Sequence, residues 1–238
     1  MSNLEMTPQS AFTAAGAVTA ERVTAFLRKV YGWMFVGLVV TAAVALAVAG
    51  SPSIAQAVFA NRFLFFGLMI AELGLVFYLS ARIQKLAPAT ASGLFLLYSA
   101  LNGVTLSFIF LAYTGTSIAT TFFVTAGMFG ALALYGTTTK RSLAGVGQFV
   151  FMGLIGVILA SIVGMFWKSA ALQFVISIVG VIVFTGLTAW DAQKLKTMAA
   201  TVPESSYGSY AVVGALALYL DFINLFLFML RFLGGRRD

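Results

Sequence analysis

The hydrophobic pattern of this chain consists of seven long apolar segments separated by short polar ones. Each apolar segment approaches the roughly 20 residues that a helix needs to cross a bilayer. The segments are continuous and lack the alternation, in stretches of about ten residues, that marks a membrane β-barrel. The pattern therefore predicts an all-α polytopic membrane protein, folded as a seven-helix bundle. The predicted spans cover residues 30–50, 63–80, 89–111, 117–136, 146–167, 171–190 and 207–230.

The polar segments between the predicted spans are short, which leaves no room for a separate soluble domain. The clearest breaks are GSPS at 50–53, RIQKLAP at 82–88, TTTKRS at 137–142 and TVPESS at 201–206. Residues 23–238 are therefore expected to form one transmembrane domain. Residues 1–22 are small and polar, and we expect a disordered cytoplasmic segment there. A cleavable signal peptide is not predicted, because the basic residues follow this segment and the first apolar run is a full span.

Composition supports the membrane assignment and excludes several other classes. The chain is 61% hydrophobic and 9% charged, whereas soluble domains are about 45–50% apolar and about 25% charged. Lys and Arg outnumber Asp and Glu by 14 to 7, but no basic cluster of the kind that binds nucleic acid is present. The lack of cysteine excludes disulfides and thiolate metal sites. The lack of histidine removes the side chain that usually titrates near neutral pH.

The distribution of basic residues predicts the orientation in the membrane. With the N-terminus in the cytoplasm, nine Lys and Arg residues fall on the inner side and five on the outer side, as the positive-inside rule favours. Seven spans then place the tail RFLGGRRD outside, where its three arginines violate the rule. A last segment that re-enters the membrane would remove the violation, so the side of the C-terminus stays open.

Three acidic residues fall within or at the edge of a predicted span: Glu72, Asp191 and Asp221. A charge at such a depth is unfavourable by about 2.5 to 3.5 kcal/mol on insertion scales, and by default indicates function. Glu72 is predicted to line an ion path, and the alternative is a protonated acid bonded to a carbonyl. Thr188, one turn before Asp191, and Asn224, close to one turn after Asp221, are predicted to give polar support.

Asp191 and Asp221 are placed symmetrically about the break between the last two spans. Each lies fifteen residues from position 206, where TVPESS ends, so an antiparallel helix pair brings them to the same level. With the sixth span extended to about Met198, that level is ~10 Å inside the cytoplasmic boundary. Two carboxylates within hydrogen-bond range in a low dielectric cannot easily both ionise, so they share one proton. The sequence predicts a pH-sensing pair; the alternatives are a contact that only ties two helices together and, for Asp191, a boundary position in headgroup water.

Four segments carry a resemblance to a known family. GLTAWDAQKLK at 186–196 looks like the motif that ends the sixth span in the Bax inhibitor-1 (transmembrane BAX inhibitor motif) family, although Asp-Ala-Gln replaces the usual Asp-Thr-Gln. LYLDFINLFLFMLRFLG at 218–234 closely resembles the last-span signature of that family. AELGLVF at 71–77 and LNGVTLSFIFLAYT at 101–114 are similar to the second and third spans of bacterial members. The resemblance covers the chain from about residue 25 to its end.

The resemblance implies a seven-helix bundle with a central last helix and a pH-sensitive calcium leak in the bacterial inner membrane. It implies that Asp191 and Asp221 are the proton-sensing pair. It also implies that a basic residue at the end of the second span latches onto this pair, for which Arg82 is the nearest candidate. The expected partners are the lipid bilayer, Ca²⁺ and protons, and some bacterial relatives associate with a membrane-bound protease. No cofactor, bound metal or nucleic acid is expected, and Ca²⁺ is the permeant ion.

Three alternative functions were weighed against the leak channel. A retinal pump needs a lysine inside the last span, and residues 207–230 contain none. An intramembrane aspartyl protease also pairs two span aspartates, but Asp221 is flanked by Leu220 and Phe222 rather than by the glycines typical of such sites. The protein is therefore not expected to be an enzyme. A membrane adaptor that transports nothing and modulates a membrane protease or another membrane complex stays open as the alternative.

Overall fold

The computed structural model describes residues 8–83, 85–167, 169–235 and 237, and side chains from residue 20 onwards. Within these residues the chain is helical, with no strand, which confirms the predicted all-α class. The helices are α1 (Pro8–Ala49), α2 (Pro52–Ala60), α3 (Arg62–Arg82), α4 (Pro88–Leu106), α5 (Ile109–Ala112), α6 (Gly115–Thr138), α7 (Ala144–Phe166), α8 (Ala170–Thr201) and α9 (Tyr207–Leu233). A 3₁₀ turn, Glu204–Ser206, joins α8 to α9.

Seven helical segments are long and apolar enough to cross a membrane, which confirms the predicted number of spans. They are Ala20–Ala49, Arg62–Arg82, Pro88–Ala112, Gly115–Thr138, Ala144–Phe166, Ala170–Thr201 and Glu204–Leu233. The third combines α4 with α5. Most ends agree with the predicted ones to within a few residues, and the largest differences are the early start of the first span and the late end of the sixth.

Two helical regions differ from the sequence prediction. Helix α1 begins at Pro8, so residues 8–22 are helical where we expected a disordered segment. That stretch contains five alanines, and alanine has the highest helix propensity. Residues 1–7 lie outside the described residues, so disorder there stays a prediction. Helix α2 was not predicted at all. It has Pro52 in its first turn, and its C-cap residue, Asn61, is also the N-cap of α3.

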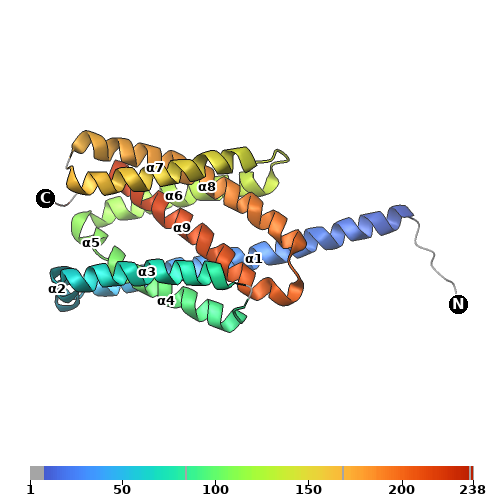
Figure 1. Ribbon diagram of the computed structural model, residues 1–238, viewed down its shortest axis with the longest axis horizontal. Helices are drawn as coiled ribbons and strands as arrows, with labels where there is room; N and C mark the ends of the chain where they lie inside the picture. The colour runs from blue at the N-terminus through green and yellow to red at the C-terminus, as the bar shows by residue number, and fades with distance from the viewer. Residues whose placement is uncertain (1–7, 84, 168, 236, 238) are drawn as a thin grey trace.

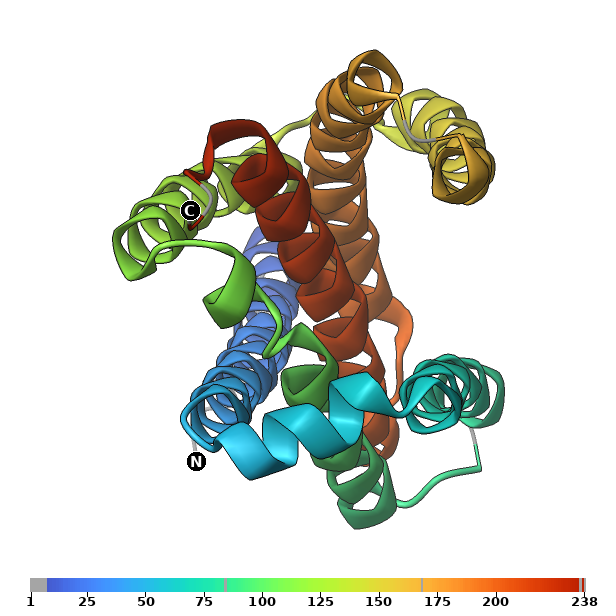
Figure 2. The same cartoon turned by 90° about the vertical axis from the view of Figure 1, so that its left-hand side faces the viewer.

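Helix α9 runs through the centre of the bundle (Figure 2). It contacts α1, α3, α4, α6 and α8, and side chains on nearly every side of it are buried. The most enclosed are Leu216, Leu218, Tyr219 and Leu225. Helices α3 and α7 lie at the periphery: Leu79 is the only residue that α3 buries fully. The resemblance predicted a central last helix, and the packing confirms it.

The connections fall into two groups at opposite ends of the bundle (Figure 1). At one end, Ser209 donates to the carbonyl of Leu86 at 2.7 Å, and Lys196 donates to the carbonyl of Thr137 at 2.6 Å. These contacts gather the α3–α4, α6–α7 and α8–α9 connections beside the start of the first span. The chain ends at the other side of the bundle, beside the α5–α6 connection. Helix α9 is continuous over 27 residues, so no re-entrant segment occurs within the described residues.

Helices α8 and α9 form the antiparallel pair that the sequence predicted. A Cβ added to Gly180 would come within 2.6 Å of the Phe228 ring, and one added to Gly214 within 2.6 Å of Leu195. In each contact the two residues are equally far along the chain from about position 204. That position is two residues before 206, the midpoint predicted from Asp191 and Asp221. Because small residues let the two helices approach closely, the register between α8 and α9 is closely defined. That register sets the level of Asp191 relative to Asp221.

Candidate functional site

The two aspartates of the predicted pair lie on facing helices near the middle of the α8–α9 contact. Asp221 on α9 is 5% exposed, and Asp191 on α8 is half-buried. The carboxylate of Asp191 acts electrostatically on that of Asp221, and the Lys194 ammonium acts on both. One oxygen of Asp221, Oδ2, is buried and has no hydrogen-bond partner among the described residues. The structure therefore places the two aspartates on helices that pack against each other, with one buried oxygen of Asp221 unpartnered among the described residues; a proton shared between them stays a prediction.

Thr188 and Asn224 do not bond to the aspartates. The Thr188 hydroxyl donates to the carbonyl of Phe184 at 2.8 Å, and the Asn224 amide donates to the carbonyl of Leu220 at 2.8 Å. Both partners are backbone groups one turn earlier in the same helix. These two polar residues satisfy their donors locally, so support for the pair from either one stays a prediction.

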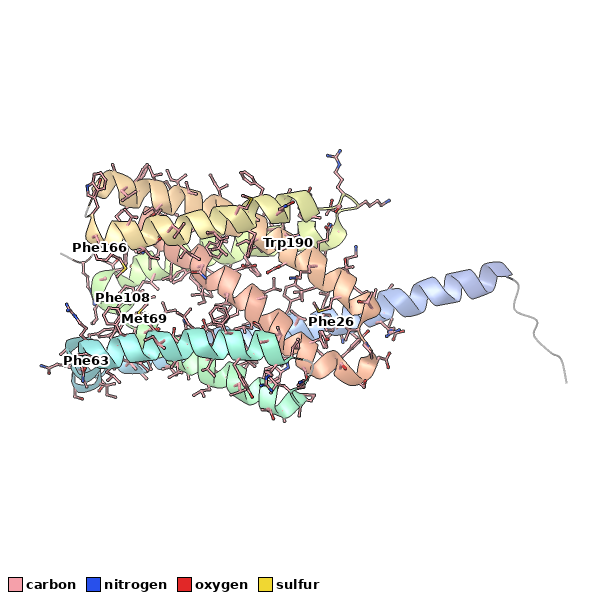
Figure 3. The ribbon with its side chains drawn as sticks, in the orientation of Figure 1. Phe26, Phe63, Met69, Phe108, Phe166 and Trp190 are labelled. Carbon is pink, nitrogen blue, oxygen red and sulfur yellow. The ribbon has the colours of Figure 1, made fainter. Side chains whose placement is uncertain are left out.

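Arg82, the predicted latch, is exposed at the last turn of α3. Within the described residues it makes no ion pair with either aspartate. The cation close to the pair is instead Lys194, which also lies 5.2 Å from the centre of the Trp190 ring. Figure 3 shows Trp190 near the end of the bundle that holds the N-terminus. The latch role of Arg82 stays a prediction, and Lys194 joins it as a second candidate.

Glu72 is at the centre of a second polar site, formed between α3 and α4. Its Oε1 accepts a hydrogen bond from the Thr105 hydroxyl at 2.9 Å, and its Oε2 accepts one from the Asn102 amide at 3.3 Å. Glu72 is only half-buried, whereas Thr105 and Asn102 are buried. The carboxylate is thus bound by side chains of α4, and both the ion-path role of Glu72 and the protonated alternative stay predictions.

Tyr219 connects this second site to the centre of the bundle. Its hydroxyl donates to Oδ1 of Asn102 at 3.1 Å and lies 2.6 Å from the Thr41 hydroxyl. Thr41 in turn lies 2.9 Å from the carbonyl oxygen of Ser99. A chain of hydrogen bonds therefore joins α3, α4, α9 and α1 across the interior. Such a network in a low dielectric holds its members in a defined geometry, because an unpaired polar group there is unfavourable.

Helix α9 carries one residue of each polar site. Tyr219 and Asp221 are two positions apart, which rotates their side chains by about 200° around the helix axis. Tyr219 consequently points to α1 and α4, and Asp221 points to α8. A change in the position or rotation of this central helix would alter both sites together.

The sequence analysis identified Asp191, Asp221 and Glu72 but missed Asn102, Thr105 and Tyr219. A usable signal existed for the first two of these. Asn102 and Thr105 are three residues apart, so they share one face of a helix within an otherwise apolar span. For Tyr219, the only signal in the sequence was its position two residues before Asp221.

The described residues contain no group of three or more acidic side chains that would hold a metal ion. Neither polar site offers more than two carboxylates: one has Asp191 and Asp221, and the other has Glu72 with the neutral amide of Asn102 and hydroxyl of Thr105. Ca²⁺ favours six to eight oxygen ligands in its protein sites. The arrangement is therefore suited to transient contacts with a cation.

The chain is similar over most of its length to bacterial proteins. Residues 23–238 match the model of the family described as inhibitor of apoptosis-promoting Bax1. The chain is 54% identical over 215 residues to the inner membrane protein YbhL of Escherichia coli K12, an alignment that covers 89% of this chain and 92% of that protein. It is 47% identical over 215 residues to an uncharacterized protein of Borreliella burgdorferi, with coverage of 90% and 93%. It is 42% identical over 219 residues to a protein of Rickettsia prowazekii, with 92% of each chain covered. The matched region contains every residue of the two polar sites.

Proposed function

The chain belongs to the Bax inhibitor-1 family, and from that premise we propose that it is a pH-sensitive Ca²⁺ leak channel of the cell inner membrane. Its N-terminus faces the cytoplasm in this proposal, as the basic residues favour. The relative YbhL is named an inner membrane protein, which supports the location. No catalytic residue and no cofactor are assigned.

The observation that carries the proposal is the buried carboxylate of Asp221. It lies in the centre of the bundle with an unpartnered oxygen, on the helix that packs against α8, which carries the half-buried Asp191. A buried polar oxygen without a partner is rare in folded proteins and calls for an explanation. A proton shared between the two carboxylates supplies that partner. The shared proton would also make the pair sensitive to pH in a chain without histidine.

The direction of the pH effect follows from the charge of the pair. With one shared proton the site carries about one negative charge and attracts a nearby cation, either Lys194 or Arg82. A second proton removes that charge as the pH falls, so the cation is released and the helix that carries it becomes freer to move. An attraction weakened by about 1.4 kcal/mol shifts a closed–open equilibrium about tenfold. The leak is therefore expected to rise as the pH falls.

The ion path is proposed to pass Glu72. Glu72 is half-buried and bound by two neutral donors, so its negative charge is not cancelled by a cation among the described residues. A lone carboxylate attracts Ca²⁺ without providing the full set of oxygen ligands that tight binding needs. These features favour a slow leak over a selective pore with high affinity.

Purified protein in liposomes tests this function directly. Liposomes carry a Ca²⁺-sensitive dye inside and receive external Ca²⁺ at two pH values, for example 6 and 8. The proposal expects a flux above that of protein-free liposomes at both pH values, and a faster flux at the lower one. A flux equal to that of empty liposomes at both pH values would exclude a channel and favour the adaptor, which transports nothing on its own.

A further inference from the structure

A cleft of about 920 Å³ opens at the end of the bundle where the chain ends. Its walls come from the α4–α5 junction, the end of α7, the start of α8 and the end of α9 with the tail. Its lining includes Phe108, Ser169, Gln173, Phe174, Arg231 and Arg237. Figure 3 shows Phe108 and Phe166 at this end of the molecule.

Two arginines face this cleft, and neither forms an ion pair with another of the described residues. The Arg231 guanidinium donates to Oε1 of Gln173 at 3.4 Å and lies 5.7 Å from the centre of the Phe228 ring. The Arg237 guanidinium donates to the carbonyl of Phe110 at 2.8 Å. Within the described residues, no acidic side chain lines the cleft. A guanidinium has five N–H donors, and these contacts use one donor of each.

Both arginines are fixed in place by the surrounding structure. The amide of Gln173 donates to the carbonyl of Gly164 at 3.4 Å, so Gln173 links Arg231 to the end of α7. The backbone N–H of Arg237 donates to the carbonyl of Ala112 at 3.1 Å, and the N–H of Gly235 donates to the Ser117 hydroxyl at 3.0 Å. The tail therefore does not extend freely into solvent at these residues. It holds the second guanidinium beside the first.

The start of α8 adds to the positive character of the cleft. Ser169 is its N-cap and accepts a hydrogen bond from the N–H of Leu172 at 3.3 Å. Helix α8 has 32 residues, and the N-terminus of a long helix carries a partial positive charge of about half an elementary unit. Together, two guanidinium groups and a helix N-terminus favour a ligand with a negatively charged, multivalent oxygen group.

The rim of the cleft is aromatic and lies at the ends of spans. Phe174 is 55% exposed and Phe232 is 46% exposed, and their rings pack with centres 5.7 Å apart. The neighbouring Phe166 and Trp167 are 86% and 70% exposed. Exposed aromatic residues at the end of a span are typical of the headgroup region of a bilayer. A ligand in the cleft would thus have its charged group on the arginines and its apolar part against these rings.

We propose that this cleft binds the phosphate group of an anionic phospholipid, with Arg231 and Arg237 as its two positively charged contacts. A lipid is the source that fits, because a free phosphate ion would leave the aromatic rim without a partner. The binding also accounts for the arginines of the tail, which the positive-inside rule disfavours on the predicted outer side. Arginines that bind a lipid phosphate there would tie α8 to the end of the central helix α9.

A binding titration on the purified full-length protein tests this inference independently of Ca²⁺ transport. Short-chain phosphatidylglycerol is titrated into the detergent-solubilised protein, and bound lipid is counted by native mass spectrometry. The same titration uses short-chain phosphatidylcholine, which carries no net charge, and inorganic phosphate. We expect phosphatidylglycerol to bind at least about tenfold more tightly than either of the others.

The double variant R231Q/R237Q is expected to bind phosphatidylglycerol roughly 25-fold more weakly, from about fivefold for each arginine near a membrane surface. The matched control is R62Q, which removes an exposed arginine at the same end of the molecule, outside this cleft, and should bind as the wild type does. R231K/R237K keeps the charges and should recover part of the loss. Equal binding of the two lipids, unchanged binding by R231Q/R237Q, or tight binding of inorganic phosphate would each overturn the proposal.

Discussion

At the scale of single residues, the two polar sites differ in how the protein satisfies their charges. Both oxygens of Glu72 accept hydrogen bonds from α4, and the Tyr219 hydroxyl extends that network to Thr41. Asp221 has no equivalent set of donors and leaves Oδ2 unpartnered. A carboxylate with satisfied oxygens is suited to holding a fixed charge. A carboxylate with an unpartnered buried oxygen is suited to exchanging a proton.

Glu72→Gln separates an ion-path role from a purely structural one. The change keeps the size of the side chain and its capacity to accept from Thr105, but it removes the charge. If Glu72 attracts the permeant ion, Ca²⁺ flux in liposomes should fall about tenfold, equivalent to ~1.4 kcal/mol. Unchanged flux would instead assign Glu72 to a structural role.

Tyr219→Phe is the matched control for Glu72→Gln. It removes the hydroxyl from the same network while keeping the ring that packs 5.7 Å from Phe95 and 5.8 Å from Tyr98. Leaving buried polar partners unsatisfied destabilises a protein by about 1 to 3 kcal/mol, so the melting temperature should fall. The flux of the folded protein should change less than in Glu72→Gln. If both variants lose flux equally, the geometry of the network matters and the charge of Glu72 does not.

The acidic residues could be found from the sequence because a charge stands out within an apolar span. The pairing of the remaining members could not, even though Asn102 and Thr105 share one face of a helix. Thr, Asn and Tyr occur in many membrane helices, and the partners here are far apart along the chain: Glu72 and Asn102 are 30 positions apart, and Asn102 and Tyr219 are 117 apart. Only the packing of α3, α4 and α9 reveals which polar groups meet.

At the scale of helices, α3 is the least restrained of the described spans. It buries one residue fully, Leu79, and its contacts are mainly with α4, then with the short helix α2 and, more weakly, with α9. It also carries Glu72 of the polar network near its middle and Arg82 at its end. A helix with so little buried surface can shift more easily than α9, so in the proposed channel we expect the gating motion to occur in α3.

Arg82→Ala and Arg62→Ala test that assignment on opposite ends of the same helix. If Arg82 is attracted to the aspartate pair, its removal should raise the leak at neutral pH about tenfold and weaken the pH response. Arg62→Ala should do neither, because Arg62 lies at the far end of α3. Lys194→Ala provides the comparison on α8. A response to Lys194→Ala without a response to Arg82→Ala would make Lys194 the latch and leave Arg82 as a positive-inside anchor.

The number of spans followed directly from the apolar segments, whereas the end of α8 and the presence of α2 did not. The apolar run alone predicted an end near 190, and the placement of Asp191 opposite Asp221 extended the span to about Met198, close to the observed end of α8 at Thr201. Its last turns contain polar side chains that interrupt the apolar pattern but bond to the α6–α7 connection: Gln193 donates to the carbonyl of Arg141 at 2.9 Å, and Lys196 to that of Thr137. Helix α2 was missed because its nine residues are too few to give a membrane-span signal.

In the whole molecule, the central helix α9 links the two polar sites and the cleft lined by Arg231 and Arg237. Tyr219 and Asp221 lie in its middle, and Arg231 lies in its last turn. A movement of α9 would change the geometry of all three sites. Its extensive burial, however, holds α9 in position when the surrounding helices move. The sequence alone showed that the last span was unusual, but only the packing shows that it contacts five other helices.

The central claim is that one shared proton on Asp191 and Asp221 controls a Ca²⁺ leak. The most direct test is the pH profile of Ca²⁺ flux in liposomes for the wild type, Asp191→Asn, Asp221→Asn and the double variant. The account predicts a flux that rises with falling pH in the wild type, a flattened profile in each single variant, and a double variant that adds little to the more affected single one. Profiles that change independently and additively in the two single variants would contradict the shared proton.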